Sequence, residues 1–264
     1  DPWKIMVAFT LITAVLSAIL DNVTTVLLVG PMSIAIARML KIDPVPFLMG
    51  QILASNVGGT ATLIGDPPNI MIGSAAHLSF MDFLDNTGFA VLFILAVLIL
   101  LMKIVYEKKI ELGTVDTGAI EKLDPSKSIT NRALMRKGII VLICVIIGFM
   151  FHDKLGIESS IIALTAAAVM LVIGREDVDQ AIQDVEWTTI LFFMSLFVVV
   201  GGLTETGIIK ELASKIIDAT DGHPMVTMLV LLWASALLSS ILDNIPFVAT
   251  LIPLILAMQA DGMD

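Results

Sequence analysis

The chain has 264 residues, of which 57% are hydrophobic and 15% charged, with a formal net charge of −10. Its mean hydropathy of +0.97 is far above that of an ordinary soluble domain, so we expect a membrane protein. The acidic balance argues against a nucleic-acid partner, which needs a clustered basic face, and the single cysteine, Cys144, excludes a disulfide framework within this chain.

The first predicted element is a helical hairpin over residues 4–38, with Asp21-Asn22 at its tip. Each arm has about 15–17 residues, which is marginal for crossing roughly 30 Å of hydrocarbon. Basic residues lie at both open ends of the hairpin: Lys4, Arg38 and Lys41. Because basic residues favour the cytoplasmic side, we expect a re-entrant hairpin that enters and leaves through that face.

The next predicted element, over 44–78, is a helix broken in its middle. The segment GGTATLIGDPPN, from Gly58 to Asn69, gathers three glycines, two prolines and four polar side chains. Backbone that leaves a helix at membrane depth must be buried in protein or line a wet cavity. We expect the backbone from Gly58 to Gly65 to leave the helix close to Asn22, where glycines would let carbonyls and amides approach a ligand. Asp66 is placed to cap the following helix, to bind an ion, or both.

Apolar runs and one basic segment follow in alternation. Eight of the fifteen Lys and Arg residues lie between Lys103 and Lys137, so the positive-inside rule predicts a cytoplasmic linker over 107–137. Residues 204–223 are predicted to form an amphipathic helix at the outer interface. Five apolar runs are about long enough to cross the bilayer, some with tilt or thinning: 86–105, 138–151, 159–174, 187–203 and 225–242, the last of which leads into the second hairpin tip.

The last predicted element is a second hairpin that repeats the first. LSSILDNIPFVATLIP (238–253) matches LSAILDNVTTVLLVGP (16–31) at eight of sixteen positions, and the Asp-Asn pair recurs as Asp243-Asn244. Such duplicated polar interruptions point to the binding site of a secondary transporter. Five predicted crossings separate the hairpins. Because this number is odd, the repeat is inverted, with the first tip reachable from the cytoplasm and the second from outside.

The expected fold class is an all-α polytopic membrane protein with inverted repeats, re-entrant helical hairpins and a discontinuous helix. Residues 1–264 would form one transmembrane domain: 1–106 belong to the first repeat, 107–137 to the linker and 138–264 to the second repeat. The repeat offset places the counterpart of Gly58 at about 280, beyond the last residue. We therefore expect this chain to be an internal piece of a longer protein.

The candidate binding residues are polar side chains and glycines at the two tips and the break. A carboxylate at the bilayer centre costs about 2.5–3.5 kcal/mol, so two at repeat-related positions favour a shared polar cavity, with helix capping as a compatible second role. A coupling Na⁺ is expected near Asn22 and Gly59 and near Asn244. The full set is Asp21, Asn22, Thr24, Thr25, Asn56, Gly58, Gly59, Thr60, Thr62, Gly65, Asp66, Asn69, Asp243 and Asn244.

Four segments together resemble the group of arsenite-pump membrane proteins, NhaD and the pink-eyed-dilution P protein. They are SAILDNVTTVLLVGP (17–31), ASNVGGTATLIGDPPNI (54–70), VEWTTILFFMSLFVVVGGL (185–203) and SSILDNIPFVATLIP (239–253). That group belongs to the larger ion transporter superfamily, which also contains citrate and dicarboxylate carriers. The resemblance implies hairpin tips and a broken-helix loop that bind substrate and coupling ion, a moving transport part and commonly a homodimer. Carboxylate carriers typically have Ser-Asn-Thr at the tips, where this chain has Asp-Asn-Val and Asp-Asn-Ile.

The leading functional hypothesis is a secondary active transporter of a small ion, such as arsenite, antimonite or another inorganic or organic anion. It would be coupled to H⁺ or Na⁺ by alternating access, in the inner cell membrane. A Na⁺/H⁺ antiporter is the main alternative; a di- or tricarboxylate carrier, an ion channel and an intramembrane aspartyl protease also remain open. We expect no catalytic residue and no cofactor other than the coupling ion. The expected partners are the lipid bilayer and the small ion, and a soluble ATPase partner stays open.

Overall fold

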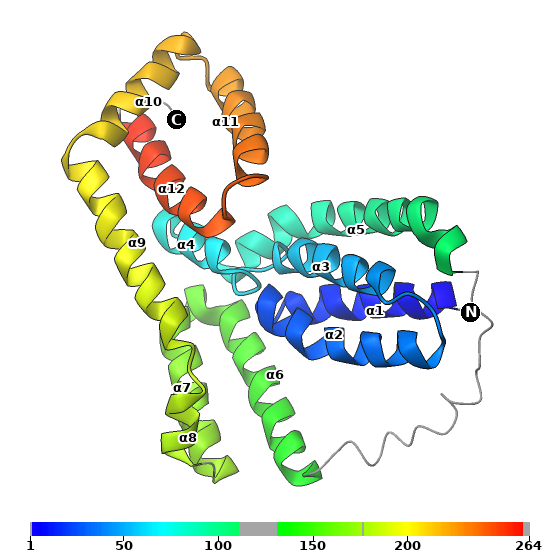
Figure 1. Ribbon diagram of the computed structural model, residues 1–264. Helices are drawn as coiled ribbons and strands as arrows, with labels where there is room; N and C mark the ends of the chain where they lie inside the picture. The colour runs from blue at the N-terminus through cyan, green and yellow to red at the C-terminus, as the bar shows by residue number, and fades with distance from the viewer. Residues whose placement is uncertain (1, 111–130, 176, 261–264) are drawn as a thin grey trace. The chain divides into compact units, whose positions relative to one another are not determined.

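A computed structural model describes residues 2–110, 131–175 and 177–260, and all regular structure in these ranges is α-helical (Figure 1). Four helices of this part are long and apolar enough to span a membrane, or five if one bent helix pair forms a single span. The four are Asn22–Met39, Phe80–Glu107, Arg132–His152 and Trp187–Glu205. The predicted all-α polytopic membrane class is therefore confirmed, and the chain is an integral membrane protein.

The chain divides into two compact units, which are described separately. Unit 1 comprises Asp1–Gly73 and His77–Val178, and unit 2 comprises Ser74–Ala76 and Asp179–Asp264. This division follows packing and is separate from the repeat boundaries predicted around residues 107–137. Most of that predicted linker, 111–130, lies outside the described residues.

The first hairpin and the broken helix form the core of unit 1. Three helices, α1 (Pro2–Ser17), α2 (Asn22–Met39) and α3 (Val45–Gly59), lie side by side, and α1 packs closely against α3 (Figure 1). The second half of the broken helix is α4 (Pro67–Ala76). An apolar cluster, which includes Met6, Leu40, Phe47 and Met102, fills the space between the first three helices and α5 (Phe80–Ile110).

The tip between α1 and α2 is a tight turn followed by a capped helix. Leu20 N–H donates to the Leu16 carbonyl at 2.7 Å. One carboxylate oxygen of Asp21 then accepts the N–H groups of Val23 and Thr24, at 2.9 and 3.0 Å. Asp21 therefore satisfies two of the N–H groups that a helix leaves unpaired at its start.

Long helices complete unit 1. The predicted runs 86–105, 138–151 and 159–174 lie within α5 (Phe80–Ile110), α6 (Arg132–Leu155) and α7 (Ser159–Gly174). Lys137 Nζ donates to the Ile173 carbonyl at 2.6 Å and so pairs a carbonyl at the end of α7. A second apolar cluster of Leu63, Phe80, Phe83 and Phe149 joins the break to α5 and α6.

Unit 2 contains the predicted amphipathic helix and the second hairpin. Its helices are α8 (Val178–Gln183), α9 (Trp187–Glu205), α10 (Ile208–Ala219), α11 (Pro224–Ser239) and α12 (Asn244–Ala260). The first two residues of the predicted amphipathic segment end α9, and most of the rest forms α10, whose axis bends by 119° to α11. Its apolar side, with Ile209 and Ala213, packs against Leu254 and Met258 of α12. The position of this helix at the outer interface stays a prediction, and the packing shows only that α12 covers part of its apolar side.

The second hairpin tip repeats the local geometry of the first. Leu242 N–H donates to the Leu238 carbonyl at 2.8 Å, and a carboxylate oxygen of Asp243 accepts the Ile245 N–H at 2.9 Å. Both distances are within 0.1 Å of their counterparts at the Asp21 tip. The sequence repeat is thus also a repeat of backbone structure.

Candidate functional site

The tip of the first hairpin and the break between α3 and α4 meet in unit 1. Ser17 Oγ donates to the Ser55 carbonyl at 2.8 Å, and Thr62 Oγ1 donates to the Ala18 carbonyl at 2.5 Å. These bonds join residues 38 and 44 positions apart in the sequence. The tip and the break are therefore one packed structure.

Three glycines permit this close approach. A Cβ on Gly58 would overlap the backbone of Ala14, and a Cβ on Gly65 would overlap the backbone of Gly59 and Ser17. Gly58 and Gly59 still belong to α3, so the prediction that the backbone leaves the helix at Gly58 is wrong by two residues. The irregular segment is 60–66. In the structure these glycines serve the contact between α1, α3 and the break, because backbone already fills the space that we expected a ligand to use.

The irregular segment is held by two side chains outside it. Asn69 Nδ2 donates to the carbonyls of Gly59 and Thr62, at 2.9 and 2.8 Å. Thr87 Oγ1 on α5 donates to the Thr60 carbonyl at 3.0 Å. Asn69 is buried, and its two amide hydrogens hold the break in shape. In this geometry its amide nitrogen positions the loop.

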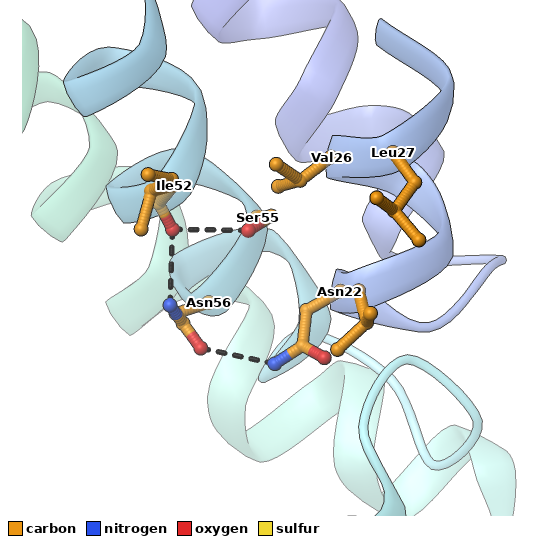
Figure 2. A pocket seen from close by; sticks show the side chains of 7 residues that line it. Asn22, Val26, Leu27, Ile52, Ser55 and Asn56 are labelled. Atoms are coloured by element: carbon orange, nitrogen blue, oxygen red, sulfur yellow. Dashed lines mark hydrogen bonds between the residues drawn. The ribbon is translucent and has the colours of Figure 1, made fainter. Parts of the chain in front are cut away.

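A cluster of amides and one carboxylate lies where the tip faces the break. Asn22 Nδ2 at the start of α2 donates to Asn56 Oδ1 at 3.0 Å and approaches Asp66 Oδ2 at 3.5 Å. Asn56 in turn donates to the Ile52 carbonyl at 2.9 Å (Figure 2). Asp66 is only 9% exposed. Three residues predicted for the site thus come together: a tip amide, a helix amide and the carboxylate of the break.

Asp66 occupies the cap position of α4, but its side chain makes no capping hydrogen bond. The reason is the sequence that follows. Pro67 and Pro68 have no N–H to donate, and the first available N–H, that of Asn69, bonds to the Asp66 carbonyl at 3.0 Å. The prediction of side-chain capping is therefore wrong, and one carboxylate oxygen of Asp66 approaches the Asn22 amide instead.

Four helix ends converge on this cluster. The carboxyl ends of α1 and α3 carry partial negative charge, and the amino ends of α2 and α4 carry partial positive charge. Each amino end has its own carboxylate, Asp21 or Asp66. No Lys or Arg takes part in the hydrogen bonds described at the tip and the break. Two carboxylates and the carbonyl ends therefore favour a cation over an anion at this point.

An open cleft of about 330 Å³ adjoins the cluster, between α2 and α3 (Figure 2). Its apolar wall consists of Val23, Val26, Leu27 and Ile52, and its polar end consists of Asn22, Ser55 and Asn56. The cleft is large enough for a small ion with part of its hydration shell. The amides of the cluster are thus reachable from one side.

The remaining predicted residues lie in different surroundings. Thr24 and Thr60 are exposed, whereas Thr25 is fully buried. Asp243 is exposed and caps α12, and Asn244 begins that helix. These last two belong to unit 2, so a cavity shared with Asp21 stays a prediction.

Sequence reasoning missed three residues that build the site. Ser17 and Ser55 link the hairpin to α3, and Thr87 links the break to α5. The repeat contained a signal for Ser17, because its counterpart Ser239 is also serine. Ser55 and Thr87 had no such signal, since ordinary polar residues acquire these roles only through packing.

A transition-metal centre has no support in the ranges that the structure describes. There, no group of three or more His, Cys, Asp or Glu side chains is placed to hold a metal ion. The cluster offers amide oxygens, one carboxylate and backbone carbonyls. These hard oxygen donors suit Na⁺ or a proton on Asp66 better than a metal that prefers nitrogen or sulfur.

Comparison with known proteins gives a consistent result. The sequence model of the citrate transporter family matches residues 1–264. The "46 kDa membrane protein" of Mycobacterium leprae is 37% identical over 100% of this chain and 62% of its own length. An uncharacterized transporter of Mycobacterium tuberculosis is 38% identical over 98% of this chain and 60% of its own length. The P protein of Sus scrofa is 29% identical over 98% of the chain and 40% of its own length, which confirms the predicted resemblance to the P-protein group. The chain spans about three fifths of the length of the two mycobacterial relatives.

Proposed function

The chain belongs to the citrate transporter family, and from this premise we propose that it works as a secondary active transporter of a small ion. Transport would be coupled to H⁺ or Na⁺ and would proceed by alternating access. The transported ion would be arsenite, antimonite or another inorganic or organic anion. We assign no enzymatic step to the protein.

One observation carries this proposal. The Asn22 amide at the hairpin tip bonds to Asn56 of α3 and approaches Asp66 of the break. Irregular backbone and helix ends that meet around polar side chains are the usual construction of an ion site in a transporter. Because the tip and the break contribute to the same cluster, an ion bound there would sense the position of both.

The chemistry of the cluster fits the coupling cation better than an anionic substrate. Asp66 and two amide oxygens supply acceptor atoms, and the described bonds at the tip and break include no basic side chain. A negatively charged substrate would lie next to the Asp66 carboxylate and be repelled by it. We therefore assign the coupling ion to this cluster and the substrate to the adjoining cleft.

A Na⁺/H⁺ antiporter is the second candidate, and Asp66 is the specific observation that favours it. A buried carboxylate beside neutral amides can hold either Na⁺ or a proton, but not both. Competition of this kind is sufficient for exchange of the two cations without any other substrate. The two candidates differ in whether flux of an anion accompanies cation movement.

Flux through liposomes that contain the full-length protein tests both candidates. Uptake of citrate, arsenite and ²²Na⁺ would be measured with an imposed Na⁺ or proton gradient, together with internal pH. A coupled carrier gives saturable uptake of one anion that the gradient accelerates, whereas an antiporter exchanges Na⁺ for protons with no anion present. Non-saturating, uncoupled flux would identify a channel, and the absence of any flux would overturn the proposal.

A further inference from the structure

A seam of buried polar side chains runs between α1, α2 and α3, behind the cleft. Each member is at most 2% exposed, and none carries a charge. The members are Thr10, Ser17, Thr25, Ser33, Gln51 and Ser55. A polar group so deeply buried needs a hydrogen-bond partner, because it has lost its contacts with solvent.

Three of these side chains have such partners in the protein. Thr10 Oγ1 donates to the Met6 carbonyl at 2.9 Å, and Ser55 Oγ donates to the Ile52 carbonyl at 2.9 Å. Ser17 donates to the Ser55 carbonyl, as described above. On the α1 side, the seam is therefore satisfied by backbone carbonyls.

Two polar atoms at the interface between α2 and α3 lack such a partner in the described ranges. Thr25 Oγ1 and Gln51 Oε1 find no hydrogen-bond partner among the described residues, although both residues are fully buried. The other end of the Gln51 amide, Nε2, donates to Ser33 Oγ. Exchanging the two ends of the amide would leave Nε2 unpaired instead, so one end lacks a protein partner in either orientation.

We propose that the interface between α2 and α3 holds two buried water molecules, one on the Gln51 amide and one on the Thr25 hydroxyl. Buried water commonly pairs polar groups that the protein itself leaves unsatisfied. A water molecule has both donors and acceptors, so it serves an amide oxygen and a hydroxyl equally well.

A dehydrated cation does not fit the same two atoms. It would need several oxygen ligands around one point. Ser33, the bonding partner of Gln51, lies eight residues from Thr25 on α2, which is about 12 Å along the helix. The seam also contains no carboxylate. These sites are thus distinct from the cluster around Asp66, and they do not depend on which ion is transported.

The cleft meets the seam at one residue, and the proposed water molecules would enter there. Ser55 lines the cleft and also belongs to the seam. At the end of the α2–α3 interface away from the cleft, the apolar cluster that includes Leu40 and Phe47 packs the two helices together. The contact between α1 and α3 leaves less room for water, because Gly58 brings backbone directly against Ala14. The two proposed water molecules would therefore lie between α2 and α3, and not between α1 and α3.

A cryo-EM structure of the full-length protein in nanodiscs, at a resolution that shows water, tests the proposal directly. We expect density at about 2.7–3.2 Å from the Gln51 amide and from Thr25 Oγ1. A dry interface, or side chains of the protein paired with these atoms, would overturn the proposal.

Thermal unfolding of the full-length protein gives an independent test. Thr25→Val keeps the shape of the side chain and removes its hydroxyl, and Thr10→Val is the matched control because that hydroxyl bonds within its own helix. If water pairs Thr25, Thr25→Val lowers the Tm, as Thr10→Val does. A Tm of Thr25→Val above the wild-type value would contradict the proposal, since removing an unpaired buried hydroxyl is stabilising. If Thr25→Val does not fold, the presence or absence of water density in the cryo-EM map decides between the two outcomes.

Discussion

At the scale of single residues, Asp66 shows how the neighbouring sequence determines what a carboxylate can do. An Asp before a helix ordinarily accepts N–H groups of the first turn. Pro67 and Pro68 remove two of those donors, and the Asn69 N–H bonds to the backbone carbonyl of Asp66. The Asp66 carboxylate therefore approaches the Asn22 amide instead of capping α4, and in the proposed site it would bind the coupling cation.

The first prediction concerns that charge. Asp66→Asn should raise the Na⁺ concentration needed for half-maximal transport by at least about tenfold, which corresponds to about 1.4 kcal/mol of cation binding. The measurement is flux in liposomes at varied Na⁺ and pH. Asp85→Asn, at an exposed position of α5, is the matched control. Equal cation dependence in wild type and Asp66→Asn would remove Asp66 from the coupling site.

The second prediction concerns the close contact at Gly58. Gly58→Ala should reduce the yield of folded protein and lower its Tm, because the new methyl group overlaps the Ala14 backbone, and overpacking typically costs about 1–3 kcal/mol. Gly202→Ala in α9 is the control, since a Cβ there has no neighbour within 4 Å. Fluorescence-detected gel filtration and thermal unfolding would compare them. Equal stability of the two variants would mean that the α1–α3 contact is looser than described.

At the scale of elements, the two hairpins share one construction, and each uses its Asp as a helix cap. Capping and ion binding are separable, because Asn also caps helices but has no charge. The third prediction follows from this. Asp21→Asn should keep the free energy of unfolding within a few tenths of a kcal/mol of the wild-type value and abolish coupled transport. Asp21→Ala should in addition destabilise the protein by about 0.5–2 kcal/mol.

Thermal unfolding and liposome flux together check this prediction. The same pair of substitutions at Asp243 provides an internal comparison, because that carboxylate caps α12 in the same way. If Asp21→Asn and Asp243→Asn both transport like the wild type, the two carboxylates serve only as helix caps.

The fourth prediction concerns the break as an element. Asn69→Ala removes both donors that hold the Gly59 and Thr62 carbonyls, each unpaired buried group costing about 1–3 kcal/mol. We expect a lower Tm and a weakened affinity for the coupling cation, because the loop that frames Asp66 loses its shape. Exposed Asn86→Ala on α5 is the control. Unchanged stability of Asn69→Ala would show that the loop keeps its form without that side chain.

At the scale of the whole molecule, the inverted repeat is the proposal with the widest consequences. It requires the first tip to open toward the cytoplasm and the second toward the outside, with the 107–137 linker cytoplasmic. The sequence basis is the excess of Lys and Arg near that linker. The shared geometry of the tips supports a duplicated origin.

The fifth prediction tests that orientation. In the full-length protein without other accessible cysteines, Thr24→Cys should react with impermeant thiol reagents from the cytoplasmic side. Pro246→Cys should react from the outer side. Inside-out and right-side-out vesicles separate the two cases, and the exposed Thr24 side chain makes its labelling feasible. Labelling of both positions from one side only, in every transport state, would rule out the inverted repeat.

The sequence by itself determined the features that depend on neighbours along the chain. Hydropathy identified the long helices, and the repeated Asp-Asn motif identified both hairpin tips. The cluster of glycines and prolines located the break to within two residues, because these residue types act on their own backbone. The proximity of Asn22 to the break was predicted from the transporter pattern of hairpin tips and a broken helix, and the contacts of Asn22 with Asn56 and Asp66 agree with it.

Only the tertiary structure decided which partner each polar group has. The prediction that Asp66 caps α4 failed because capping depends on which N–H groups are present and free. Asn69 bonds to carbonyls of the break, and Gly58 meets Ala14, a contact between residues 44 positions apart in the sequence. Ile209 and Ala213 on the apolar side of α10 pack against Leu254 and Met258 of α12. Hydrogen bonding and close packing are properties of residues that meet in space, and the order of residues along a chain does not specify which ones meet.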